Sequence, residues 1–134
     1  MKKLSDIEKI INSELTTKIN KSLIKHDNLI LFIDFEDNLE VINFLKTHND
    51  TKFRQLIDIT AVDYPQNDLR FSLVYLLLSH ETNLRAMIKF NLKENDQINS
   101  ITPIFPAANW MEREVFDMYG ISFKNHPDLR RILT

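Results

Sequence analysis

The chain has 134 residues, a formal net charge of −2 and a hydrophobic content of 43%. These values suit one globular domain with a real core, and they lack the basic excess of a nucleic-acid binder. The longest apolar run, Leu73–Leu78, is far shorter than the roughly 20 residues of a membrane-spanning helix. The charges at 6, 8 and 9 interrupt any apolar targeting segment at the start.

Two residue types are almost missing, and their scarcity limits the chemistry that the chain can perform. There is no cysteine, which excludes iron–sulfur ligation, cysteine-based zinc sites and thiol catalysis by this chain. Gly120 is the single glycine, so a phosphate-binding or dinucleotide-binding glycine loop is excluded. The four histidines are far apart in the sequence. We therefore expect no catalytic, cofactor-binding or metal-binding residues on this chain.

The first predicted element is an amphipathic helix over residues 5–20, because hydrophobic residues recur there at helical spacing. Ser5 and Glu8, which are three residues apart, predict a capping box at its start. Strand-forming runs at 22–26 and 29–35, separated by an Asp-Asn pair, then predict a β-hairpin.

A second helix is predicted between Asp37 and His48, and three long strands follow it at 54–64, 69–79 and 84–92. Four-residue polar turns separate these strands, which is typical of an antiparallel meander.

Within the first strand of the meander, strict alternation places Ile57, Ile59 and Ala61 on one face. The residues between them then face the other way.

The last third of the chain begins with a polar connection over 93–100. Pro106 suits the first turn of a third helix, and Gly120 suits the left-handed position that ends it. A short extended piece at 121–123 and a final short helix from about 126 complete the chain. The element order predicts an α+β, two-layer domain: helix, two strands, helix, three strands, and a C-terminal helix. Its sheet is expected to be mixed and largely antiparallel, with the helices on one face.

The stretch "NWMEREVFDMYG" in the third helix concentrates charged side chains. Each helical residue advances by about 100°, so Glu112 and Glu114 face opposite ways and cannot form a paired-carboxylate site. Arg113 and Asp117 have the spacing of an ion pair.

This cluster supports two interpretations. Glu114, Asp117 and His126 could form a metal or general-acid site, or the charges could form a structural ion-pair network. We favour the network, because carboxylates three residues apart are common on helices and the histidine lies on another segment. Trp110 is expected to pack, with Arg113 stacked on its ring.

Arg130 and Arg131 also leave two interpretations open. They could anchor a partner through bidentate pairing, for which arginine is suited. They could instead be surface charges or pair with Glu112 and Glu114.

The segment "NWMEREVFDMYGISFKNHPDLRRIL" resembles the signature of the C subunit of respiratory complex I, the NADH-quinone oxidoreductase. The mitochondrial counterpart is the 30 kDa subunit. Upstream, "DITAVDYP", "RFSLVYLLLS" and "LRAMIKF" resemble the middle strands of that family, so the resemblance covers about 53–134. The residues expected to form a structural lock and a partner-docking surface are Trp110, Glu112, Arg113, Glu114, Asp117, Gly120, His126, Pro127, Asp128, Arg130 and Arg131.

The resemblance implies a single domain over 1–134, with the signature at 109–133. It implies a non-catalytic subunit of the peripheral arm that docks on the D subunit, next to the B subunit, near the quinone site. The assembled complex would use FMN, iron–sulfur clusters, NADH and quinone, none of them bound by this chain. The complex would lie on the cytoplasmic face of the bacterial inner membrane, or on the matrix side in mitochondria.

Two alternatives and one departure accompany this resemblance. The alternatives are a homologous subunit of a membrane-bound hydrogenase or formate hydrogenlyase, and a stand-alone metal-dependent hydrolase. Members of the family usually continue past "DLRRIL" into a C-terminal tail that wraps along neighbouring subunits. This sequence ends at Thr134, so we expect weaker partner binding than with a tail.

Overall fold

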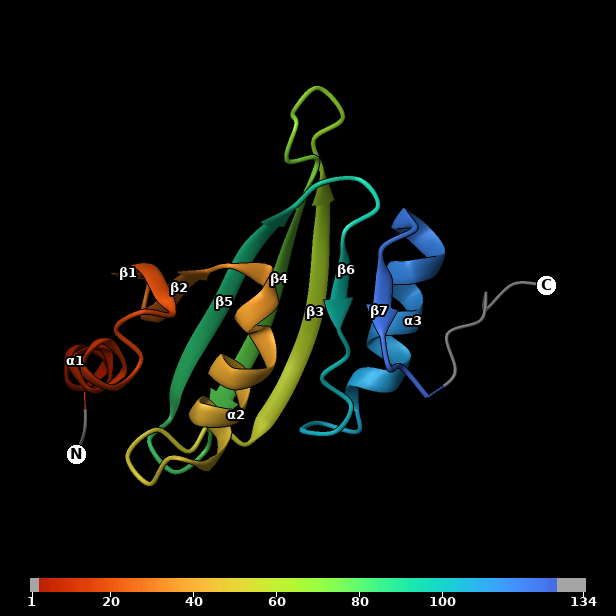
Figure 1. The fold of residues 1–134 in the computed structure, drawn as a ribbon. Helices are drawn as coiled ribbons and strands as arrows, with labels where there is room; N and C mark the ends of the chain where they lie inside the picture. Colours follow the sequence, from red (N-terminus) through yellow and green to blue (C-terminus); the bar gives the residue numbers. More distant parts are fainter. Residues whose placement is uncertain (1–2, 128–134) are drawn as a thin grey trace.

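The computed structural model describes residues 3–127, and a five-stranded sheet forms its centre (Figure 1). In spatial order, the strands are β1 (Ile19–Lys25), β2 (Asn28–Ile33), β5 (Leu84–Leu92), β4 (Phe71–Ser79) and β3 (Gln55–Asp63). Only the β2–β5 pair is parallel, and the other three pairs are antiparallel. The predicted fold class, a mixed and largely antiparallel sheet in an α+β domain, is confirmed.

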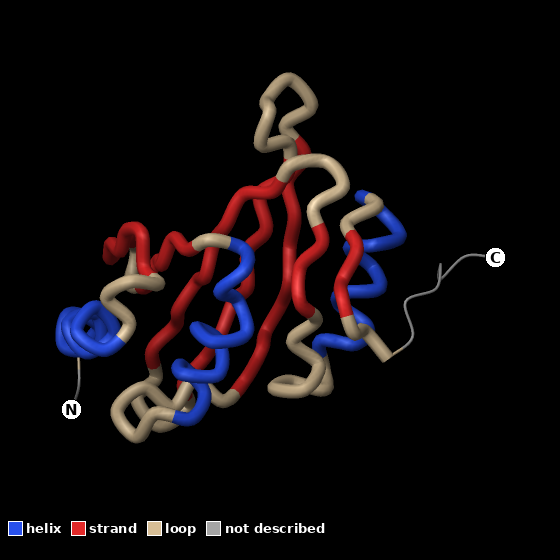
Figure 2. Tube along the Cα trace, viewed as in Figure 1, coloured by secondary structure: helices blue, strands red, loops and turns tan. Residues whose placement is uncertain are grey.

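The remaining elements pack on one face of this sheet and at its two ends, as Figure 2 shows by colour. They are α1 (Leu4–Glu14), the 3₁₀ turn η1 (Phe35–Asp37), α2 (Asn38–Thr47), β6 (Gln97–Asn99), α3 (Ala108–Tyr119) and β7 (Ser122–Lys124). Strands β6 and β7 form a small parallel sheet of their own. The predicted second helix and the antiparallel meander β3–β4–β5 are confirmed.

The core lies between the sheet and the helices. Along β4 every second residue is buried, from Phe71 to Ser79. On this buried face, Leu73 and Tyr75 of β4 belong to one hydrophobic cluster with Ile42 of α2 and Val115 of α3. The alternation in the sequence therefore determines which face of the sheet receives the helices.

The hairpin between β1 and β2 turns through His26 and Asp27, one residue earlier than the punctuation in the sequence suggests. Both residues have positive φ, 52° and 62°, and Lys25 pairs with Asn28 across the turn. Positive φ at both central residues characterises the primed turn whose twist matches two-residue hairpins. The predicted hairpin is confirmed, without the glycine that such turns prefer.

The first helix is shorter than predicted, because it ends at Glu14 and Ile19 already belongs to β1. The hydroxyl of Thr16 donates to the backbone carbonyl of Asn12 at 2.8 Å, just past the end of the helix. Such side-chain bonds offer the backbone an alternative to the helix. The predicted cap is also wrong, because the backbone N–H of Lys3 donates to Asp6 rather than to Glu8.

A β-bulge in β3 corrects the predicted alternation. The pairing with β4 shifts between Leu56 and Asp58, so Ile57 is the extra residue and is 38% exposed. Leu56 and Ile59 are buried instead, on the core side. A bulge adds one residue to one strand and reverses the facing of everything before it.

The segment between β5 and α3 holds more structure than a polar connection. It contains β6, which the sequence pattern did not predict, whereas the predicted extended piece at 121–123 corresponds to β7. Pro106 precedes α3 rather than lying in its first turn, since the helix begins at Ala108. The short helix predicted from about 126 lies mostly outside the described residues.

Candidate functional site

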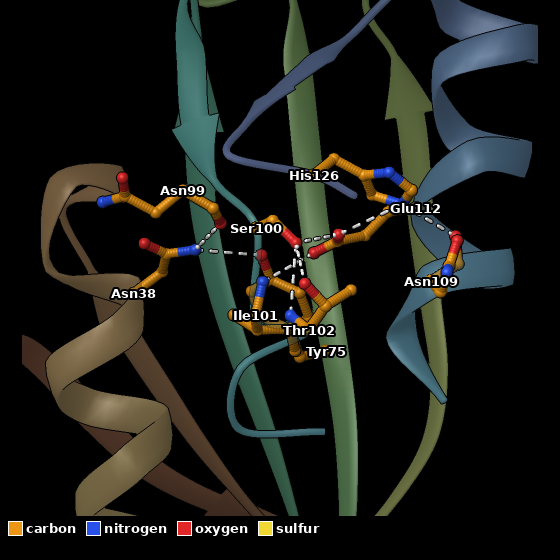
Figure 3. A network of polar contacts seen from close by, with 9 residues as sticks. All are labelled: Asn38, Tyr75, Asn99, Ser100, Ile101, Thr102, Asn109, Glu112 and His126. Carbon is orange, nitrogen blue, oxygen red and sulfur yellow. Dashed lines mark hydrogen bonds and ion pairs between the residues drawn. The ribbon is translucent and has the colours of Figure 1, made fainter. Parts of the chain in front are cut away.

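Glu112 is the buried centre of the charged cluster. This residue is 0% exposed, and its carboxylate accepts hydrogen bonds from the Ser100 hydroxyl at 2.6 Å and from the Ile101 backbone N–H at 2.9 Å (Figure 3). These bonds hold the loop that follows β6 against α3. Glu112 therefore acts inside the domain and presents no carboxylate to solvent.

His126 closes the same network from the segment that follows β7. Its Nε2 lies 3.0 Å from the carbonyl oxygen of Asn109 and 3.8 Å from Oε1 of Glu112, and the side chains of His126 and Glu112 are fully buried. A carbonyl oxygen only accepts, so the Nε2 atom carries the proton in this contact. The chain just past β7 is thus fastened to the first turn of α3.

Burial dominates the electrostatics of Glu112. Loss of water around the carboxyl group raises its pKa to about 7, although the bonds from Ser100 and Ile101 act in the opposite direction. Charge on a buried carboxylate is costly unless it is paired and hydrogen-bonded. The site therefore favours the neutral acid over a wide pH range.

The network extends to the other side of the core through residues that the sequence did not single out. The Nδ2 of Asn38 on α2 donates to the backbone carbonyl of Asn99 at 2.7 Å and to the Tyr75 hydroxyl at 3.3 Å. Burial raises the pKa of Tyr75, which stays a neutral phenol. Polar contacts thus connect α2, β4 and the end of β6. The next residue, Ser100, begins the bonds to Glu112 (Figure 3).

No pattern in the sequence could have revealed this extension. Asn38, Tyr75 and Ser100 are far apart in the chain and carry no shared spacing. Ser100 also lies at the end of the stretch interpreted as a polar connection. Only the fold brings these three residues into one buried polar network.

The opposite side of α3 faces solvent and is built differently. Trp110 is 52% exposed, its indole N–H donates to Glu114 at 2.8 Å, and the guanidinium of Arg113 lies 5.5 Å from the indole ring. Met118, about two turns beyond Trp110, is 72% exposed. The predicted separation of Glu112 from Glu114 and the stacking of Arg113 on Trp110 are confirmed, whereas Trp110 is not a packing group of the core.

Gly120 ends the helix with φ at 74°, in the left-handed region. Its N–H donates to the carbonyl of Phe116 at 2.8 Å. The prediction for this glycine is confirmed, and the turn directs the chain into β7.

The alternative metal set is not assembled. Glu114 contacts Trp110 on the exposed side of α3, whereas His126 is buried against Glu112. Within residues 3–127, no group of three or more His, Asp or Glu side chains could hold a metal ion. Asp128, Arg130 and Arg131 lie outside the described residues, so their roles stay predictions.

In residues 3–127, no helix is long and apolar enough to cross a membrane. The fold itself occurs in other solved structures. It matches a trypsin-resistant fragment of Nqo5 with a TM-score of 0.75 and 26% identity, covering 92% of this chain and 98% of that one. A chain of the membrane-bound sulfane sulfur reductase, an archaeal respiratory membrane complex, shares the fold with a TM-score of 0.84 and 23% identity, over 97% of this chain and 75% of that one.

Residues 31–134 match the family described as respiratory-chain NADH dehydrogenase, 30 Kd subunit, and the chain belongs to this family. One relative is the C subunit of the NADH-quinone oxidoreductase of Chelativorans sp. (strain BNC1), 41% identical over 131 residues. That match covers 98% of this chain and 66% of the relative. The chain spans about half to two thirds of the length of the curated relatives it matches. The family resemblance predicted from the signature is confirmed.

Proposed function

We propose that the chain is a structural subunit of the peripheral arm of a proton-pumping NADH:quinone oxidoreductase, docked on the D subunit beside the B subunit near the quinone site. Membership of the 30 Kd subunit family supports this function. The observation that carries it is the two-sided helix α3. Its inner side fastens the domain through Glu112, and its outer side presents Trp110 and Met118 to solvent.

The outer side of α3 has the composition of an interface centre. Tryptophan, arginine and methionine are enriched in protein interfaces, and tryptophan and arginine dominate the binding energy there. Here Trp110 and Met118 are exposed on α3, and the guanidinium of Arg113 lies over the indole ring. The bond from Trp110 to Glu114 orients this ring. An exposed but oriented aromatic side chain loses little conformational entropy on binding.

We propose further that this chain carries no catalytic residue and no cofactor of its own. The absence of cysteine supports this, because an iron–sulfur cluster needs thiolate ligands. FMN, clusters, NADH and quinone would then be bound by the neighbouring subunits. The chain would contribute to the enzyme activity only by holding these subunits in place. The complex would lie at the cytoplasmic face of the bacterial inner membrane, or on the matrix side in mitochondria.

The experiment is an affinity purification of the tagged native chain from its own cells, with the recovered proteins identified by mass spectrometry. We expect the homologue of the D subunit, together with further subunits of the oxidoreductase. Consistent recovery of the chain without any of them would refute the proposed function.

A second function is suggested by the shared fold of the archaeal reductase chain. In that case the chain would serve a related membrane-bound complex, such as a hydrogenase or formate hydrogenlyase. The same purification decides between the two, because NADH-oxidising subunits would be recovered only in the first case.

A further inference from the structure

The sheet has a second face, turned away from the helices in Figure 1. The strand register places an apolar band on this face. Leu23 pairs with Ile30, Ile30 with Met87 and Met87 with Leu76. Directly paired residues point to the same side of a sheet, so these four side chains cross β1, β2, β5 and β4 in one row. Tyr75, the neighbour of Leu76, lies in the core on the other side.

Among residues 3–127, no helix covers this band. The buried hydrophobic residues of α1, α2 and α3 belong to the core cluster on the other face. Leu23, Leu76 and Met87 are partly exposed and are absent from the side chains that pack against that core. Ile30, which lies between Leu23 and Met87, is 8% exposed. Exposed apolar surface on a sheet face that no helix covers marks interaction sites.

Cations border the band on both sides. Lys21 and Lys89 lie on one side, where their ammonium groups are 5.7 and 6.0 Å from the ring of Phe32. Lys25 and Arg85 lie on the other side, both level with Asn28 in the strand register. Two positive charges therefore flank each edge of the apolar band.

These four cations have no acidic counterpart within the described part of the chain. None of them forms an ion pair there, whereas lysines and arginines elsewhere form salt bridges with Asp or Glu. Asp58, on the edge strand β3, is the one acidic side chain in these rows. For a chain with a net charge of −2, this is a marked local excess of positive charge.

The dimensions of this surface match those of a short α-helix. Along β1 and β5 the flanking cations are four residues apart, which is about 13 Å and close to the roughly 10–12 Å diameter of an α-helix. Across four strands the band measures about 14 Å, the length of about ten helical residues.

We propose that this face of the sheet binds an amphipathic helix of a partner protein, with its apolar stripe on the band and carboxylates along both borders. Complementary charge at the borders orients such a helix and speeds its association. The inference takes from the proposed function only that the chain works within an assembly. It concerns a surface separate from the outer side of α3.

The test combines cross-linking with charge reversal in the native cells. A photo-reactive amino acid at position 87 should cross-link to one partner peptide with helical apolar spacing and flanking Asp or Glu residues. Arg85→Glu with Lys89→Glu should raise the dissociation constant for that partner by about tenfold or more. Lys9→Glu, at an exposed position on α1, is the matched control and should leave binding unchanged. Melting curves verify that each variant folds.

Rescue makes the test specific. Replacing the flanking carboxylates of the cross-linked partner by lysine should restore its binding to the doubly reversed variant. Cross-links to lipid alone, to peptides without carboxylates, or to nothing would overturn the inference, as would unchanged binding of the reversed variant. If no oxidoreductase subunit is recovered but an acidic helix is cross-linked and rescued, the proposed function fails while this surface stands.

Discussion

At the scale of single residues, Glu112 holds the loop after β6 against α3. Its carboxylate satisfies the Ser100 hydroxyl and the Ile101 N–H in a dry environment. Glu112→Ala would leave the Ile101 N–H buried without its partner and the Ser100 hydroxyl with Thr102 alone, 2.8 Å away. The substitution should lower the free energy of unfolding by about 2 kcal/mol. Glu112→Gln keeps the shape and one acceptor, so its loss should be smaller. Urea unfolding measures the free energy of unfolding of both variants. Equal losses in Glu112→Ala and Glu112→Gln would contradict this prediction.

The raised pKa of Glu112 predicts a pH-dependent stability. In the unfolded chain this carboxyl group titrates near 4.5, whereas in the folded domain its pKa is about 7. Between pH 4.5 and 7 the folded state binds a proton at Glu112 that the unfolded state releases. The contribution of this group to the free energy of unfolding is therefore complete below pH 4.5 and is lost as pH rises through 7. The contribution is on the order of 3 kcal/mol.

The pH dependence of stability is measured as the difference between the wild type and a variant without the carboxyl group. Unfolding free energies of the wild type and of Glu112→Gln are compared from pH 4 to 8, because other groups titrate in both. Their difference isolates the contribution of the carboxyl group at position 112. The wild type should lose its advantage as pH rises, and parallel curves would show that the carboxyl group is not held neutral.

Gly120 is a second residue whose role is conformational. A Cβ atom at this position would meet nothing within 4 Å, so the positive φ of 74° is the one source of strain. Gly120→Ala should destabilise by about 1 kcal/mol. Gly120→Asn should cost less, because asparagine tolerates the left-handed region. A thermal melt of both variants tests this, and an unchanged alanine variant would count against the strain.

At the scale of elements, the sequence predicts what depends on local periodicity. The spacing of apolar residues located α2, α3 and the three long strands, and Gly120 located the end of α3. The bulge at Ile57 and the early end of α1 at Glu14 were missed. Both depend on tertiary packing or on a single side-chain bond, which periodicity does not record.

The hairpin turn between β1 and β2 offers a prediction at this scale. Asp27 has a φ of 62° in a turn that favours glycine at that position. Asp27→Gly should therefore stabilise the domain by about 0.5–1 kcal/mol. Unfolding in urea is the measurement. Asp50→Gly, in a turn where this residue has no positive φ, is the control and is expected not to stabilise. A less stable Asp27→Gly variant would argue against the primed turn.

At the scale of the whole molecule, one layer of helices and one sheet leave two distinct outer surfaces. The helix side is closed by a polar network from Asn38 to His126, and its outermost helix presents Trp110. The open side of the sheet carries the cation-bordered band. The separation of Glu112 from Glu114 was predictable, because helical geometry places these residues on opposite sides of α3. The polar network was not, because its members meet only through the fold.

The central claim is that α3 fastens the domain with one side and docks with the other. Binding of the chain to the purified homologue of the D subunit, measured by calorimetry, tests it most directly. Trp110→Ala with Met118→Ala should weaken binding at least tenfold, or about 1.4 kcal/mol, without lowering the melting temperature. Ile24→Ala, at a position 42% exposed on β1, serves as the control and should bind as the wild type does. Wild-type affinity of the double variant would contradict the claim.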